Sequence, residues 1–228
     1  GSDMGNGKKG LSARYMKQEV EASLERLQTD YIDLYQSHYD DPDTPIEETM
    51  TAFNDLIRAG KVRYIGASNL NAERIKASND FARRNKLSPY ISLQPLYNLY
   101  DREKFETEYA SLVKEEQLAV LPYYALASGF LTGKYRSEAD LNKSPRGQGV
   151  KKYLNEKGHK ILAAMDDVAK TQGVALSQIA ISWLLHQSLI TSPIASATTE
   201  KQLQELVHAS TLTLGDEQLK QLENASNY

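Results

Sequence analysis

The sequence predicts an α/β fold in which short parallel strands alternate with helices. Two observations lead to this prediction. Short apolar runs bounded by turn residues recur along the chain, and each is followed by a longer segment whose apolar residues repeat at helical spacing. The composition is also that of a globular protein, with 40 % hydrophobic and 25 % charged residues among 228. Strands that alternate with helices favour right-handed crossovers and a parallel sheet.

The first half of the chain contains the clearest elements. Residues 13–27 carry apolar side chains at helical spacing after Ser12, a residue type that suits a helix start. A strand is predicted over residues 31–36. Pro45 and Gly60 then bound a second helix, because proline fits the first helical turn and glycine its C-terminal end. Strands and helices continue in alternation over residues 62–69, 71–85, 90–98 and 102–116.

The second half begins with a strand predicted over residues 118–126. A long polar segment follows at residues 128–150 and contains several glycines and a proline, the profile of a lid rather than of a core element. We expect residues 131–150 of this segment to be poorly ordered when the ligand is absent. Pro193 and Ile194 mark a last short strand. Helices are predicted over residues 154–171, 176–186, 199–209 and 216–224.

Five predicted strands leave two architectures open. A closed (β/α)8 barrel needs eight strands, typically in ~250 residues, while a five-stranded doubly wound sheet fits the length by itself. The periodicity does not choose between them, and the sequence has neither of the common glycine-rich phosphate-binding fingerprints that would support the doubly wound sheet. Residues 1–12 are predicted to be a flexible N-terminal segment, and residues 13–228 a single domain.

Composition excludes several classes of function. The net charge of −3 offers no basic excess for nucleic acid or anionic lipid. Cysteine is absent, which excludes disulfides, thiolate metal sites and thiol catalysis and fits a cytosolic protein. No apolar run approaches ~20 residues, so no membrane span is expected, and the polar N-terminus lacks the apolar core of a signal peptide. No spacing of histidines and acids resembles a zinc or calcium site.

Polar side chains follow each predicted strand. In a parallel α/β sheet these positions gather at the end of the strands where ligands bind. A single polar strand end is ordinary, but five in succession indicate a ligand site. The residues are His38 after the first strand, Ser68 and Asn69 after the second, Gln94 and Asn98 at the third, Tyr123 and Tyr124 at the fourth, and Ser196 and Thr198 after the fifth.

Several motifs in this order resemble the aldo-keto reductase family. They are LERLQTDYIDLYQSH, LIRAGKVRYIGASN, ISLQPLYN and LASGFLTGKY, together with QLQEL after the last predicted strand. The similarity is to the branch that includes potassium-channel β subunits and related bacterial reductases, and it runs from about residue 13 to the C-terminus. It implies a (β/α)8 barrel that binds a nicotinamide cofactor and reduces carbonyl compounds, with a small aldehyde or ketone as substrate.

The resemblance implies that the catalytic group is incomplete. The family uses an Asp, a Tyr, a Lys and a His, and only His38 has a match here, as the residue that hydrogen-bonds the substrate carbonyl. Since the other three belong to the first three strand–helix units, we expect an incomplete barrel of about five βα units and no turnover by this chain alone. Tyr39 is not expected to replace the missing tyrosine, because neighbouring residues on a strand point in opposite directions.

The resemblance also implies most of a cofactor site. Ser68 and Asn69 would hold the nicotinamide carboxamide with support from Gln94, and Tyr123 would stack on the nicotinamide ring. Residues that wrap the pyrophosphate would be Tyr124, Ala125, Leu126 and Ser128, with Lys134 and Arg146 from the long loop; for these two, solvated surface charge is the rival interpretation. Ser196, Thr198, Gln202 and Glu205 match the adenosine end.

The sequence leaves open which nicotinamide cofactor binds and which function the chain has. NADP is the family default, but Thr198 stands where many relatives place an Arg or Lys for the 2′-phosphate. Lys201, one helical turn on, is a substitute cation, and NAD remains an alternative. Besides a carbonyl reductase, the chain fits a nucleotide-sensing regulatory module or a fragment without function.

Overall fold

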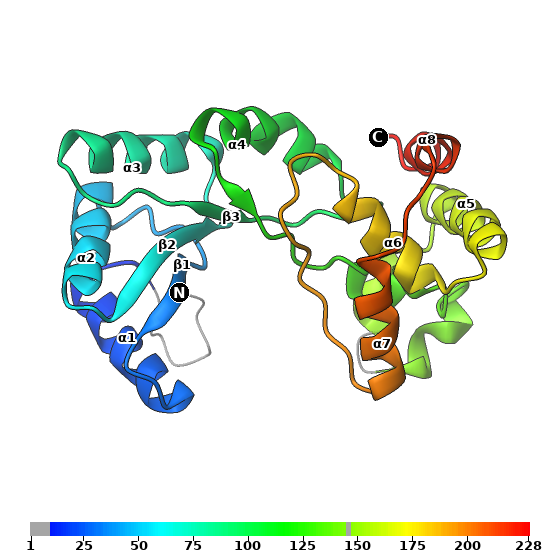
Figure 1. Cartoon of the computed structure of the whole chain (residues 1–228), viewed down its shortest axis with the longest axis horizontal. Coiled ribbons are helices and arrows are strands. Elements are labelled where there is room, and N and C mark those ends of the chain that lie inside the picture. The colour runs from blue at the N-terminus through cyan, green and yellow to red at the C-terminus, as the bar shows by residue number, and fades with distance from the viewer. Residues whose placement is uncertain (1–9, 145–146) are drawn as a thin grey trace. The chain divides into compact units, whose positions relative to one another are not determined.

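The structure is a computed structural model that describes residues 10–144 and 147–228 (Figure 1). The chain divides into two compact units. Unit 1 consists of Gly1–Gln94 and Glu108–Ala119, and unit 2 of Pro95–Thr107 and Val120–Tyr228. Among the described residues, no helix has the length and apolar character needed to cross a membrane.

A parallel sheet forms the centre of unit 1, as predicted. Strands β1 (Ile32–Ser37), β2 (Val62–Ser68) and β3 (Ser92–Gln94) pair in parallel, and the short β4 (Ala119–Val120) follows in the order β1-β2-β3-β4. The Ala119 N–H donates to the Ile91 carbonyl at 2.9 Å. Helices α1 (Ala13–Leu27), α2 (Ile46–Arg58) and α3 (Ala72–Arg84) lie along one side of β1 and β2 (Figure 1).

Local sequence signals account for the helix ends in unit 1. The Ser12 hydroxyl caps α1 by accepting the Tyr15 N–H at 3.4 Å, and the Asn71 side chain caps α3 by accepting the Arg74 N–H at 2.8 Å. Pro45 occupies the N-cap of α2, and Gly60 follows its C-terminal end with a φ of 72°. These signals set where α1 and α3 begin and where α2 begins and ends.

Aromatic packing dominates the core of unit 2. Trp183, Tyr97 and Phe105 are buried, with 5.5 Å between the Tyr97 and Trp183 ring centroids and 4.5 Å between those of Tyr97 and Phe105. The helices of this unit are α5 (Glu156–Gln172), α6 (Leu176–Leu185), α7 (Glu200–Ala209) and α8 (Asp216–Ala225), all close to their predicted ranges. The helix predicted over 102–116 is confirmed: residues 103–116 are helical, with a π-helical turn at Phe105–Tyr109 that leads into α4 (Ala110–Glu116).

Prolines shorten the later strands relative to the predictions. β3 ends before Pro95 and β4 ends before Pro122 because proline donates no ladder hydrogen bond. The fifth strand, predicted at Pro193 and Ile194, is wrong for the same reason: among the described residues this segment is not a strand. It still bonds to its neighbour, since the Thr191 and Ser192 N–H groups donate to the Val120 carbonyl at 3.0 and 3.2 Å, and that of Ile194 to Pro122 at 2.9 Å.

The prediction that residues 128–150 contain no core element is wrong. The segment forms 3-10 turns at Ala127–Thr132, Glu138–Lys143 and Gly147–Tyr153. Apolar and aromatic side chains spaced along it anchor the turns: Tyr153 stacks on Phe130 at 5.3 Å between centroids, and Tyr135 and Val150 are fully buried. A bidentate pair between Arg136 and Asp166 of α5, at 2.7 Å for both bonds, ties the segment to the helix layer.

At the N-terminus, Leu11 is packed rather than free. Its side chain is buried, its N–H donates to Asp41 Oδ2 at 2.7 Å, and its carbonyl accepts from Thr49 Oγ1 at 3.2 Å. Residues 1–9 of the predicted flexible segment lie outside the described residues.

Candidate active site

The ends of β1, β2 and β3 bring four predicted site residues of unit 1 together. The Asn69 side-chain amide donates to the His38 carbonyl at 2.9 Å and to Ser68 Oγ at 3.0 Å. The Ser68 hydroxyl donates in turn to the Gln94 carbonyl at 2.8 Å. This connected group exists because parallel strands end at the same edge of the sheet. Its amide and hydroxyl groups offer both donors and acceptors at short range.

Asn69 has a backbone conformation suited to this role. Its φ is 55°, in the left-handed region that asparagine tolerates better than most residues. The turn points its side chain back across the ends of β1 and β2, where it makes the two bonds above. Asn69 is thus both a turn residue and the link between His38 and Ser68.

His38 lies just beyond the end of β1 and is exposed. The prediction that Tyr39 points away from it is wrong: the two ring centroids are 4.5 Å apart, with the ring planes tilted by 43°. The reason is that β1 ends at Ser37, so strand alternation no longer governs the next two residues.

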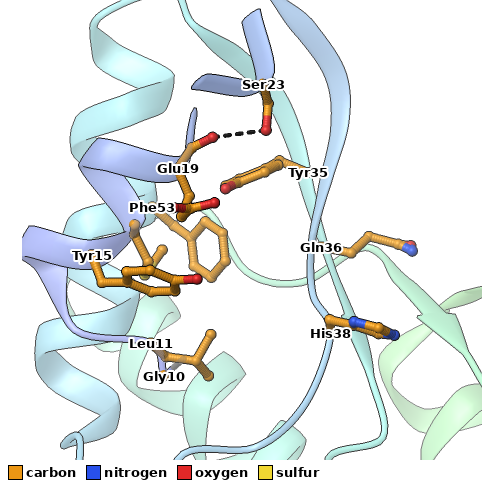
Figure 2. A pocket seen from close by; sticks show the side chains of 10 residues that line it. Gly10, Leu11, Tyr15, Glu19, Ser23, Tyr35, Gln36, His38 and Phe53 are labelled. Carbon is orange, nitrogen blue, oxygen red and sulfur yellow. Dashed lines mark hydrogen bonds between the residues drawn. The ribbon is translucent and has the colours of Figure 1, made fainter. Parts of the chain in front are cut away.

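Gln36 is a site residue that the strand-end argument misses. Its Oε1 accepts from Gln94 Nε2 at 3.3 Å, and Figure 2 shows its side chain on the same side of β1 as His38. The signal that could have found it is a polar residue inside the last turn-free part of a strand, since Gln36 lies within β1 and next to its end. Gln36 therefore extends the polar group one step along the strand from His38.

A buried hydroxyl pair supports the residue before His38. Ser37 Oγ and the Tyr90 hydroxyl are 2.9 Å apart, and both side chains are buried. Burial raises the pKa of Tyr90 to about 12, against a smaller lowering by the Ser37 hydrogen bond. Tyr90 therefore stays protonated near neutral pH and holds the end of β1 by a neutral hydrogen bond.

In unit 2, the predicted cofactor residues Tyr123 to Ser128 form a tight turn. The Tyr123 and Tyr124 rings meet edge to face, with centroids 5.2 Å apart, and Tyr124 is 56 % exposed. Buried Asn98 holds the turn through its amide, which donates to the Tyr124 carbonyl at 3.0 Å. Of the remaining members, Ala125 is buried and Leu126 is half-buried.

This turn contains an unusual density of left-handed backbone. The φ angles are 56° at Tyr124, 48° at Ala127 and 58° at Ser128, followed by 96° at Gly129. For a residue other than glycine, each such conformation costs on the order of 1–3 kcal/mol and tends to occur at functional sites. Lys134 folds over the turn, with its Cε 3.2 Å from where a Cβ on Gly129 would lie. The turn thus places the Lys134 side chain beside strained backbone.

We expect the Ser128→Gly change to stabilise the protein by about 1 kcal/mol, because glycine adopts the left-handed conformation without a Cβ penalty. Chemical denaturation measures this, with Ser188→Gly as the control, since Ser188 is absent from the positive-φ residues. The control should destabilise slightly. Equal changes in both variants would show that Ser128 carries no strain.

The predicted adenosine residues precede and begin α7. The Thr198 N–H and hydroxyl both donate to Gln202 Oε1, at 2.8 and 3.0 Å. The Glu205 carboxylate accepts from Ser177 of α6 at 3.1 Å, and Ser196 and Lys201 are exposed. The Ile194–Pro122 bond sets this segment beside the chain leading to Tyr123. Arg146, the other predicted loop cation, lies outside the described residues.

The two groups of site residues belong to different units. The described residues hold no group of three or more His, Asp or Glu that could bind a metal ion. What unit 1 offers is a histidine beside amide and hydroxyl groups. What unit 2 offers is the exposed Tyr124 beside the half-buried Tyr123, a strained turn and a lysine.

Comparison with known proteins assigns the chain to a family. A sequence profile described as the Aldo/keto reductase family matches residues 3–227. The chain is 35 % identical over 219 residues to Aldo-keto reductase AFTS1 of Alternaria alternata, covering 95 % of this chain and 58 % of that protein. It is 31 % identical over 221 residues to L-glyceraldehyde 3-phosphate reductase of Escherichia coli strain K12, covering 94 % and 64 %.

A third relative is of a different kind. The chain is 35 % identical over 208 residues to the probable voltage-gated potassium channel subunit beta of Arabidopsis thaliana, covering 88 % of this chain and 63 % of the relative. The chain therefore spans about three fifths of the length of the curated relatives it matches. Because the profile extends over nearly all 228 residues, the chain belongs to the aldo-keto reductase family of oxidoreductases.

Proposed function

We propose that this chain carries the carbonyl-orienting histidine and most of the cofactor-binding residues of an NAD(P)H-dependent reductase of aldehydes and ketones. The observation that carries the proposal is the Asn69 amide, which bonds to both His38 and Ser68. It joins the residue proposed to contact the substrate to the residues proposed to contact the cofactor. Family membership supports the reaction class.

The proposed roles follow from the chemistry of each side chain. A neutral His38 imidazole donates one N–H to the substrate carbonyl oxygen and so fixes the orientation of the carbonyl. Ser68, Asn69 and Gln94 supply the hydroxyl and amide groups that a carboxamide needs, and exposed Tyr124 beside Tyr123 leaves aromatic surface for a planar ring. When bound, the nicotinamide supplies the hydride that reduces the carbonyl carbon.

The turn in unit 2 is proposed to hold the pyrophosphate. Its positive-φ residues and the overlying Lys134 support this, because left-handed turn backbone is a recurring part of anion-binding concavities and an anion here also meets a cation. Arg146 is proposed as a second cation. Thr198, Gln202 and Glu205 are proposed to bind the adenosine, with Ser196 next to them.

The four strands and the bonded segment 191–194 are proposed to be an arc of a (β/α)8 barrel. Three parallel strands with helices along one side support this arrangement in unit 1. The proton-donating Tyr of the family, with its Lys and Asp, has no match among the motifs of this chain. We therefore assign turnover to a polypeptide that supplies those three residues as well.

NADP is the proposed cofactor, and Thr198 gives the sharpest test of cofactor choice. Replacing Thr198 with Arg should tighten NADPH binding by about tenfold, because a guanidinium binds a phosphate in a bidentate manner and one tenfold step is a modest gain for such a contact. NADH lacks the 2′-phosphate, so its affinity should not change. Calorimetric titration of the 228-residue chain with both nucleotides measures this.

The matched control is Thr211→Arg, which adds the same charge at another exposed threonine. Tightening by both variants would indicate non-specific attraction, and tightening by neither would place the 2′-phosphate elsewhere. Failure of the unmodified chain to bind either nucleotide would contradict the proposed function itself.

A second candidate function is a nicotinamide-binding regulatory module without turnover. The observation that favours it is the 35 % identity to the Arabidopsis channel subunit. Both candidates bind the nucleotide, so binding does not separate them. Carbonyl-dependent oxidation of NADPH by a polypeptide that includes the missing catalytic residues favours the reductase, and tight binding without such oxidation favours the regulatory module.

A further inference from the structure

A cavity of about 270 Å³ in unit 1 is separate from the polar group at the strand ends. It lies between α1, β1 and α2, and Tyr15, Tyr35 and Phe53 form its aromatic lining (Figure 2). The Tyr35 and Phe53 rings meet edge to face, with centroids 6.1 Å apart. Cavities of about 150 Å³ are known to hold benzene, so this one has room for a small organic molecule.

Glu19 gives the cavity its charge. It lies one helical turn after Tyr15 on α1, which places both side chains on the same face. The residue is half-buried, and across residues 10–144 and 147–228 its carboxylate forms no hydrogen bond or ion pair. By contrast, Glu21 on the same helix pairs with Lys61, and the Ser23 hydroxyl donates to the Glu19 backbone carbonyl rather than to the carboxylate.

The electrostatics of the lining agree with this charge. Burial, the negative charge of Glu19 and Tyr15 raise the pKa of Tyr35 to about 12, against a smaller opposing effect of Arg26. Tyr35 is therefore neutral, and Figure 2 shows it pointing from β1 toward Glu19. The Arg26 side chain is exposed, and its guanidinium donates to Ser23 Oγ at 3.3 Å rather than to the Glu19 carboxylate.

These features select a cation with an apolar body. Aromatic faces attract ammonium groups through their quadrupoles, and a half-buried carboxylate without a partner is stabilised by a positive ligand. An anion would be repelled by the negative charge of Glu19, and a neutral apolar molecule would leave that charge uncompensated. We propose that this cavity is a binding site for a small alkylammonium compound, held by Glu19 and the rings of Tyr15, Tyr35 and Phe53.

This site is independent of carbonyl reduction. His38 and Gln36 border the cavity, but Figure 2 shows their side chains pointing to the other side of β1, away from Glu19 and Tyr35. A bound amine therefore contacts the helix-facing side of the strand. Its binding is measured without any cofactor or turnover.

The test compares n-butylammonium with n-butanol, a neutral molecule of nearly the same shape, in calorimetric titrations of the 228-residue chain at fixed ionic strength. We expect the cation to bind at least about tenfold more tightly than the alcohol. Glu19→Gln should remove this preference. Glu25→Gln, an exposed position on the same helix, should retain it.

Two ring variants complete the design. Tyr35→Phe keeps the aromatic face and should bind the cation as the unmodified chain does, whereas Tyr35→Leu should weaken binding by about tenfold. Thermal melts confirm that each variant is folded. Equal affinity for cation and alcohol, or an undiminished cation affinity in Glu19→Gln, would overturn the proposal.

Discussion

The 228-residue chain alone is expected to show no measurable NADPH-dependent reduction of aromatic aldehydes. Reduction needs a hydride at the carbonyl carbon and a proton at its oxygen, and removing a positioned general acid typically lowers the rate by ~10²–10⁴. Here His38 would act as a solitary hydrogen-bond donor on an exposed loop. If the family's Asp, Tyr and Lys are not supplied, as proposed, poorer positioning of the substrate should lower the rate further. Spectrophotometric loss of NADPH measures the result.

Tyr39 is the residue to examine in this assay. Its ring is 4.5 Å from that of His38 between centroids, and it is 48 % exposed. The account gives this half-exposed phenol no role as proton donor, so Tyr39→Phe should leave the background rate of NADPH oxidation unchanged. Turnover by the isolated chain that His38→Ala abolishes would contradict the prediction.

The positive control is a longer polypeptide that joins this chain to a segment supplying the family's Asp, Tyr and Lys. That protein should be active, and His38→Ala should lower its rate by ~10² or more. An extended chain that binds NADPH but is inactive would favour the regulatory candidate.

Replacing Arg102 should have the largest effect on stability. The Arg102 side chain is only 11 % exposed and bonds to Glu106 at 2.7 Å, Ser226 Oγ at 2.7 Å and the Glu223 carbonyl at 3.2 Å. Removing the guanidinium leaves the half-buried Glu106 carboxylate, 26 % exposed, without its cation, so Arg102→Met should cost about 1.5–3 kcal/mol of unfolding free energy. Urea denaturation measures this.

Arg63 is the matched control. It pairs with Asp33 at 2.7 Å, but both side chains are more than half exposed. Exposed pairs contribute about 0–1 kcal/mol, so Arg63→Met should change stability little. The double variant Arg102→Met with Glu106→Leu should be more stable than Arg102→Met alone, since it removes both charges. Similar losses for Arg102→Met and Arg63→Met would contradict the account.

The Arg102–Glu106 pair predicts that the stability of the protein depends on pH. Burial acts to raise the pKa of Glu106, but hydrogen bonds from Arg102 and Tyr97 outweigh it and hold the pKa below the usual value of 4.5. The folded pKa is thus lower than the unfolded one. The stabilisation is present above about pH 4.5 and is lost as the pH falls through the folded pKa. Glu106→Gln should flatten the acid side of the stability profile.

The helices of this chain could be predicted closely, and the reason is physical. Apolar periodicity and capping residues such as Ser12, Asn71 and Gly60 act locally, so they can be recognised in the sequence without the tertiary structure. Strand lengths are harder to predict. Pro95, Pro122 and Pro193 end or prevent strands inside runs that are apolar enough to suggest longer ones.

The sequence predicts that the candidate residues at the strand ends of unit 1 lie together, but not the backbone geometry of those in unit 2. Parallel strand ends brought Ser68, Asn69 and Gln94 together as expected. The left-handed φ at Ala127 and Ser128 has no sequence signal, because neither residue favours that region. The sequence also does not predict the burial of Tyr135 and Val150. A polar segment with scattered apolar residues has the pattern of a surface loop, and only the packing of unit 2 shows that these side chains are buried.

The central claim is that His38, Ser68, Asn69 and Gln94 form one nicotinamide and carbonyl site. The most direct test is a titration of the isotope-labelled chain with NADP⁺, observed by NMR at the His38 imidazole and the Asn69 side-chain amide. His38→Ala and Asn69→Gly assign the two signals, and glycine tolerates the φ of 55° at residue 69. We predict saturable shifts of both signals with a common affinity. Saturable binding that leaves both signals unmoved, or no binding at all, would contradict the claim.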